Sequence, residues 1–163
     1  MKHYLLLISL FVAIGCKAEN MPQKTQQYQE NYHTPIAIGQ HQFIAEIADT
    51  PQAMQQGMMY RPSIKENQAM LFIFPKPQPM TFWMKNMQIP LDMLFFDKAG
   101  VLQEIKTDVP ACQADPCPTY PAQNDNNQIV AEIKAGQAKK LGLTVGDRLQ
   151  GLEGLSEGLT NDK

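Results

Sequence analysis

The chain has 163 residues, with 14 basic and 16 acidic side chains, a net charge of −2 and a sequence pI near 5.9. Proteins that bind nucleic acid concentrate basic charge on one surface, so this balance argues against nucleic acid as a partner. The length suits one domain of ordinary size, with residues left over at each end.

The N-terminus has the pattern of an export signal. Residues 1–15 begin with Met1-Lys2-His3 and continue as an apolar run of about eleven residues, whereas a membrane-spanning helix needs roughly 20. The following Ala13-Ile14-Gly15-Cys16 resembles a bacterial lipobox, which implies that Cys16 carries a diacylglyceryl anchor. The alternative is ordinary signal cleavage, for instance after Ala18.

These features predict an exported protein that is anchored to the cell envelope by lipid on Cys16. In a host with two membranes, Lys17 in place of aspartate favours the periplasmic side of the outer membrane. Residues 17–35 are rich in glutamine and lack apolar periodicity, so we expect a flexible tether there. We expect a β domain over residues 36–152 and a disordered tail over residues 153–163.

Short apolar segments separated by turn residues predict a mainly β fold. The expected strands cover residues 36–38, 43–47, 70–74, 81–84, 91–96, 101–105, 129–133 and 148–150. The first two alternate between apolar and polar residues, while the continuous apolar runs are typical of strands covered on both faces. We therefore expect a compact antiparallel β-sandwich or barrel-like domain of about seven short strands. The residues from Asp97 to Gly100 suit a type I turn.

Two short helices complete the expected fold. Asp49 or Thr50 can cap the first helix, and Pro51 fits its first turn, where a missing N–H costs nothing. The second helix is expected from Ala135 to Leu141.

The three cysteines predict a disulfide. If Cys16 accepts lipid, Cys112 and Cys117 remain, and an even remainder in an exported protein favours a disulfide between them. A zinc site is an alternative, with only His33 and His41 as further ligands in the mature chain. A redox pair is another, although such pairs more often have the spacing Cys-x-x-Cys.

Several motifs closely resemble those of one bacterial and archaeal family. They include Gly57-Met58-Met59-Tyr60-Arg61, Phe82-Trp83-Met84-Lys85-Asn86, Ile89-Pro90-Leu91-Asp92, Cys117-Pro118-Thr119-Tyr120 and Glu132-Ile133-Lys134-Ala135-Gly136. The chain thus resembles the domain of unknown function 192 family (DUF192, UPF0127-like) from about Ile36 to Arg148. It departs from the family pattern at Met58, where leucine is usual, and at Met87, where threonine is common. The resemblance implies a compact, mainly antiparallel β fold and leaves the biochemical role unassigned.

Polar residues that interrupt an apolar run mark a candidate binding site. Lys85 and Asn86 follow Trp83, and a turn near residues 88–90 would return Asp92 close to Lys85. Such a pair would hold an anionic or hydroxylated ligand through charge-assisted hydrogen bonds, with Trp83 as a stacking face. Alternatively, Lys85 and Asp92 form an ion pair that only stabilises the turn near residues 88–90, and Trp83 belongs to the core.

Arg61 and Tyr120 are the remaining candidates for ligand contact. Arg61 offers five donors and either faces a ligand or bonds to Asp92, Asp97 or Glu132. Tyr120 either lines the rim of the same cleft or caps the core. The leading hypothesis is a non-catalytic, lipid-anchored module that binds a small ligand, a glycan fragment or a protein segment and needs no cofactor.

Two other functions compete with this hypothesis. A purely structural or assembly lipoprotein would present an exposed apolar patch and no cleft. A carboxylate-dependent hydrolase of envelope glycans would bring two carboxyl groups within about 5–9.5 Å of each other. The carboxyl groups available for it belong to Glu46, Asp92, Asp97, Glu104 and Glu132.

The methionines raise a Cu(I) hypothesis, because soft thioethers suit that ion. Methionine is also an adaptable core filler, and the sequence alone favours that role. The methionines that could serve as ligands are Met54, Met58, Met59, Met80, Met84 and Met87.

Overall fold

The computed structural model describes residues 33–153. The predicted signal peptide, the lipidation at Cys16, the tether as far as residue 32 and the tail after residue 153 lie outside the described residues. Between residues 33 and 153, no helix is both long and apolar enough to cross a membrane.

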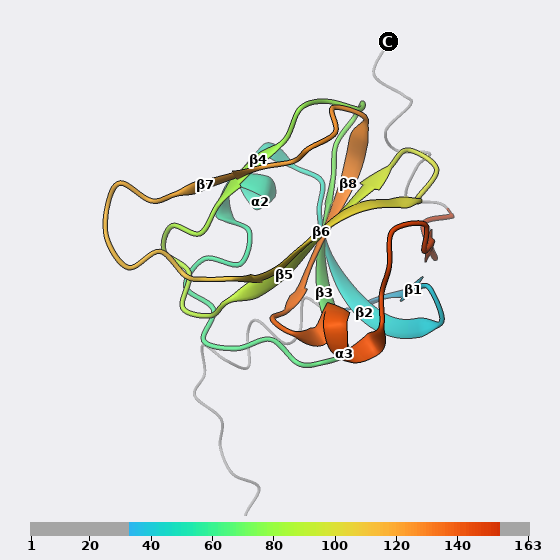
Figure 1. The fold of residues 1–163 in the computed structure, drawn as a ribbon, viewed down its shortest axis with the longest axis horizontal. Helices are drawn as coiled ribbons and strands as arrows, with labels where there is room; N and C mark the ends of the chain where they lie inside the picture. The colour runs from blue at the N-terminus through green and yellow to red at the C-terminus, as the bar shows by residue number, and fades with distance from the viewer. Residues whose placement is uncertain (1–32, 154–163) are drawn as a thin grey trace, which may run out of the picture.

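The described domain is mainly β, with short helices between the strands (Figure 1). Its elements in chain order are β1 (Thr34–Ile38), β2 (His41–Ala48), α2 (Pro51–Gln56), β3 (Gln68–Ile73), β4 (Thr81–Trp83), β5 (Leu91–Asp97), β6 (Leu102–Val109), β7 (Thr119–Pro121), β8 (Asn127–Lys134), α3 (Gln137–Leu141) and β9 (Leu149–Gln150).

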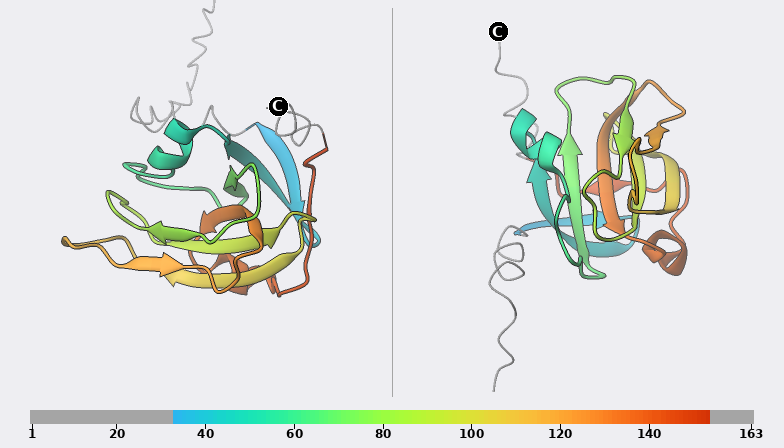
Figure 2. Two further views of the ribbon diagram at one scale, coloured as in Figure 1. Left: turned by 90° about the horizontal axis from the view of Figure 1, so that it is seen from above. Right: turned by 90° about the vertical axis from the view of Figure 1, so that its left-hand side faces the viewer.

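Seven of these strands form one sheet in the order β6-β5-β8-β3-β2-β1-β9, and β4 pairs with β7 in a separate ribbon. All pairs are antiparallel except β2 and β3, which run parallel because the chain crosses between them through α2. The large sheet curls into a half-barrel (Figure 2). The fold is therefore the barrel-like form of the predicted β architecture.

The two edges of the curled sheet are joined at one end. The predicted turn closes with a hydrogen bond from Gly100 N to Asp97 O at 3.0 Å, and the next residue, Val101, bridges to Arg148 just before β9. Leu149 N donates to Gly100 O at 2.8 Å. Gly100 has a φ of +71°, and a Cβ there would lie 2.9 Å from Leu149 O, so this junction requires glycine.

The sheet separates two hydrophobic cores because successive strand residues point to opposite faces. One core is built from isoleucine, leucine, phenylalanine and alanine side chains and contains no methionine among the described residues. The other core lies on the face that α2 and β4 cover. Five methionines are buried in it, namely Met58, Met70, Met80, Met84 and Met93.

The helices follow their predicted signals closely. Thr50 Oγ1 accepts a hydrogen bond from Ala53 N at 3.2 Å, and Pro51 occupies the first turn of α2. The second helix, α3, begins at Gln137, two residues later than expected. Strand β7 was not expected, because its partner β4 has only three residues and the pair carries no clear alternation.

Candidate functional site

A row of side chains crosses the sheet on the methionine-rich face. The strand register places Glu46 beside Met70, Met70 beside Glu132, Glu132 beside Met93, and Met93 beside Lys106. Directly paired residues share one face of a sheet, so polar side chains alternate here with methionines. Glu46 and Glu132 are two strand spacings apart, or about 9–10 Å.

Arg61 is held in this row by a partly buried ion pair with Glu46. The guanidinium Nη1 lies 2.5 Å from Glu46 Oε2, and Nη2 lies 2.7 Å from Oε1. This two-bond arrangement fits the planar fork of arginine, and Arg61 is only 2 % exposed. The ion-pair partner is thus Glu46, and none of the three acidic residues expected from the sequence takes that place.

Glu132 is the second carboxyl group of the row and is 5 % exposed. Burial raises its pKa from 4.5 to about 8, while the positive charge of Arg61 opposes the rise. Its carboxyl group makes no hydrogen bond or ion pair with any other residue between 33 and 153. At neutral pH the group is mostly protonated, so it can both donate and accept a hydrogen bond.

Glu132 faces a pocket of about 380 Å³, a volume typical of small-ligand sites. The pocket lies between α2 with its following turn, the end of β3, and β4 with the segment before it. Its apolar wall consists of Met54, Met58, Met59, Met80 and Met87 together with Phe72, Phe74, Phe82 and Trp83. Its polar groups include Gln78, Thr81, Lys85 and Glu132.

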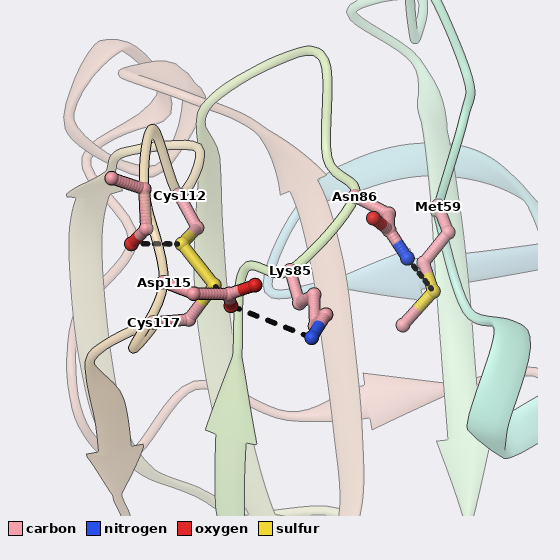
Figure 3. Close-up of polar contacts among 7 residues, drawn as sticks. Met59, Lys85, Asn86, Cys112, Asp115 and Cys117 are labelled. Atoms are coloured by element: carbon pink, nitrogen blue, oxygen red, sulfur yellow. Dashed lines mark hydrogen bonds and ion pairs between the residues drawn. A yellow bond between two sulfur atoms is a disulfide. The ribbon is translucent and has the colours of Figure 1, made fainter.

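The rim of the pocket is marked by Trp83 and Lys85. Trp83 is 49 % exposed, and Lys85 Nζ lies 5.6 Å from the centre of its ring. Lys85 Nζ also forms an ion pair with Asp115 at 3.4 Å (Figure 3). Asp115 belongs to the loop closed by the disulfide of Cys112 and Cys117, which confirms the predicted disulfide. The loop therefore reaches the residues at the pocket mouth.

Asn86 connects the rim to the turn after α2. Its side-chain Nδ2 approaches Met59 Sδ at 3.7 Å (Figure 3). Its backbone carbonyl oxygen accepts a hydrogen bond from Tyr60 N at 2.9 Å. Asn86 has a φ of 59°, a left-handed conformation that asparagine tolerates better than most residues. These contacts bring Met59 next to Asn86, the residue that precedes Met87.

Asp92 lies apart from Lys85 and has a structural position. Its carboxylate accepts hydrogen bonds from Asp108 N at 2.8 Å, Gly136 N at 3.0 Å and Ala138 N at 2.8 Å. It is fully buried and caps the first turn of α3 from strand β5. The structure does not form the expected pair of Lys85 with Asp92.

The pocket thus gathers only part of the expected site. Trp83 and Lys85 line it, whereas Arg61, Asn86, Asp92 and Tyr120 do not. Tyr120 pairs with Phe82 between β7 and β4 and packs against the second core.

Glu132 was missed as a pocket residue, although it was counted among the acidic residues. The available signal was a glutamate in the middle of an otherwise apolar strand, Ile129 to Ile133. Among the carboxyl groups of residues 33–153, Glu132 alone lines this pocket, so the two-carboxylate arrangement of a glycosidase is not formed there. The described part of the chain also has no group of three or more His, Cys, Asp or Glu residues placed to hold a metal ion.

Two solved structures are similar to this chain. One is a protein of unknown function from Novosphingobium aromaticivorans, with 28% identity over 71% of this chain and 83% of that one, and a TM-score of 0.66. The other is a putative transcription regulator from Sinorhizobium meliloti, with 31% identity over 74% of this chain and 95% of that one, and a TM-score of 0.64. No curated protein matches the chain.

A family model described as "DUF192: Uncharacterized ACR, COG1430" matches residues 34–151. The match spans the strands from β1 to β9 and hence the whole pocket wall. The chain belongs to the DUF192 family.

Proposed function

We propose that this protein is an exported, lipid-anchored binding module without catalytic activity, and that its ligand occupies the pocket in front of Glu132. The observation that carries the proposal is that Glu132, a mostly buried residue, lines an open pocket and that its carboxyl group forms no hydrogen bond or ion pair with another described residue. A carboxyl group that reaches a largely apolar pocket can orient a ligand there by hydrogen bonding.

The chemistry of the wall defines the class of ligand. The apolar wall favours a ligand that has an apolar or polarizable body. Glu132 places a carboxyl group at the inner side of the pocket, and Lys85, which is paired with Asp115, lies at the rim. Trp83 adds a flat apolar surface that is half exposed.

The fluorescent probe 8-anilinonaphthalene-1-sulfonate has an apolar body and one anionic group, so it suits a test of the pocket. Thr81 is an exposed residue of the pocket wall, and Thr107 on β6 is an exposed threonine away from the pocket. We expect the full chain to bind one probe molecule, Thr81→Trp to weaken binding at least tenfold, and Thr107→Trp to leave it unchanged. Equal binding by both variants, or none by the wild type, would refute the proposal.

The anchor is tested separately from the pocket. The leader sequence and lipobox-like residues support export and lipidation at Cys16. In a bacterial host supplied with labelled palmitate, we expect the full chain to carry label in the membrane fraction. Cys16→Ser should carry no label, and labelling of that variant would contradict the proposed acceptor.

The Sinorhizobium protein is described as a putative transcription regulator. We do not extend that role to this chain, because a net charge of −2 does not favour binding to DNA.

A further inference from the structure

The methionines are distributed very unevenly between the two faces of the sheet. Among residues 33–153, the core on one face consists of isoleucine, leucine, phenylalanine and alanine side chains and has no buried methionine. The core on the pocket face buries Met58, Met70, Met80, Met84 and Met93, and Met54 and Met87 pack against it. The methionines are thus concentrated on the face that carries the pocket.

Four of these methionines and Met59 line one pocket, from separate segments of the sequence. Met54 lies in α2, Met58 and Met59 lie in the turn after it, Met80 precedes β4, and Met87 follows β4. The 3.7 Å approach of Asn86 Nδ2 to Met59 Sδ fixes one sulfur beside the segment that carries Met87 (Figure 3). The fold therefore brings these methionines to one pocket, and no local sequence repeat accounts for their position.

We propose that the ligand of this pocket is a soft monovalent metal ion, Cu(I), bound by thioether sulfurs of the pocket methionines. Thioethers are the neutral protein ligands that favour Cu(I) over harder cations. The flexible methionine side chain lets several sulfurs turn toward one ion without a change in the backbone. This inference rests on the proposed function, because it names the ligand class of the same pocket.

The charges around the pocket are compatible with one added positive charge. Arg61 is already neutralised by Glu46, and Lys85 is paired with Asp115 at the rim. Among residues 33–153, Glu132 supplies the carboxyl group on the pocket wall, which can compensate the charge of the ion. A cation in an apolar site needs such compensation.

Leucine substitutions separate sulfur chemistry from pocket shape, since leucine keeps the apolar character and nearly the volume of methionine. The test variant is Met54→Leu/Met59→Leu/Met87→Leu, which changes three half-buried residues of the pocket wall. The control is Met70→Leu/Met84→Leu/Met93→Leu, which changes three fully buried methionines that do not line the pocket.

Cu(I) affinity is measured on the full chain without oxygen, by competition with the chromophoric Cu(I) chelator bicinchoninate. We expect the wild type and the control to bind one Cu(I), and the test variant to lose affinity at least a hundredfold while it still binds anilinonaphthalene sulfonate. Equal Cu(I) affinity in both triple variants would overturn the inference. A wild type that binds the fluorescent probe but not Cu(I) would also overturn it and leave the proposed function standing. Should the triple test variant fail to fold, Met59→Leu alone carries the test, and unchanged Cu(I) affinity in it would count against the inference.

Discussion

Replacing Glu132 by glutamine gives the sharpest test of how the pocket is built. Glutamine keeps the shape of the protonated carboxyl group but does not ionise. Burial raises the pKa of Glu132 from 4.5 to about 8, so the folded protein retains a proton that the unfolded chain has released. Retention of this proton adds to the free energy of unfolding, and the added free energy has its full value below pH 4.5. It falls as the pH rises toward the folded pKa of about 8.

The size of the effect follows from the two pKa values. Inside this window the free energy of unfolding falls by roughly 1.4 kcal/mol per pH unit. Between pH 5 and pH 8 the loss amounts to about 3.5 kcal/mol for pKa values of 4.5 and about 8. The assay is urea unfolding of the full chain across this range. We expect Glu132→Gln to remove most of that dependence and to be the more stable protein at pH 8.

Glu66→Gln is the matched control for this experiment. Glu66 is exposed, and its hydrogen bond to Lys140, at 2.7 Å, lowers its pKa. The contribution of Glu66 to the free energy of unfolding therefore has the opposite pH dependence. It is present above the unfolded pKa of 4.5 and is lost as the pH falls. We expect the control to keep the fall in stability from pH 5 to pH 8. A Glu132→Gln variant with the same pH dependence as the wild type would refute the reasoning.

Three further sets of substitutions test the contacts around the site. Asp92→Ala removes the acceptor of three backbone N–H groups, of which the Ala138 N–H is buried, and is expected to lower the free energy of unfolding by about 3 kcal/mol, measured by urea unfolding. Arg61→Met is expected to cost about 3 kcal/mol, because it removes the positive charge that faces the Glu46 carboxylate. The double change to methionine at both positions should recover much of that loss in thermal unfolding. Replacing Cys112 and Cys117 by serine opens a short loop and should cost about 2 kcal/mol by calorimetry, whereas an unchanged melting temperature would contradict this estimate.

Much of the fold could be predicted from local signals in the sequence. The turn from Asp97 to Gly100, the cap by Thr50 and the apolar runs of β3 and β5 each depend on residues close together in the chain. The parallel pairing of β2 with β3 could not be predicted in this way. The parallel pairing depends on the path of the long connection from β2 through α2 to β3. Residues close together in the sequence do not determine that path.

The candidate site was harder to predict, because its residues are brought together by the curl of the sheet. Lys85 and Asp92 are near in sequence, yet Asp92 turns inward to cap α3 and Lys85 reaches the disulfide loop. Glu132 and Met54 are distant in sequence and meet at one pocket. Once the strand order is known, the register places Glu46 and Glu132 in one row across the sheet. The sequence does not predict that β2, β3 and β8 are neighbours in that order.

The most direct test of the account is an NMR titration of the full chain labelled with ¹³C at its methionine methyl groups. The titrant is Ag(I), a redox-inert substitute for Cu(I). We expect the methyl signals of the five pocket methionines to shift until one equivalent is added, while those of Met70, Met84 and Met93 stay in place. Signals of the pocket methionines that do not move, or that move no more than those of the three buried ones, would contradict the claim that this pocket is a thioether site.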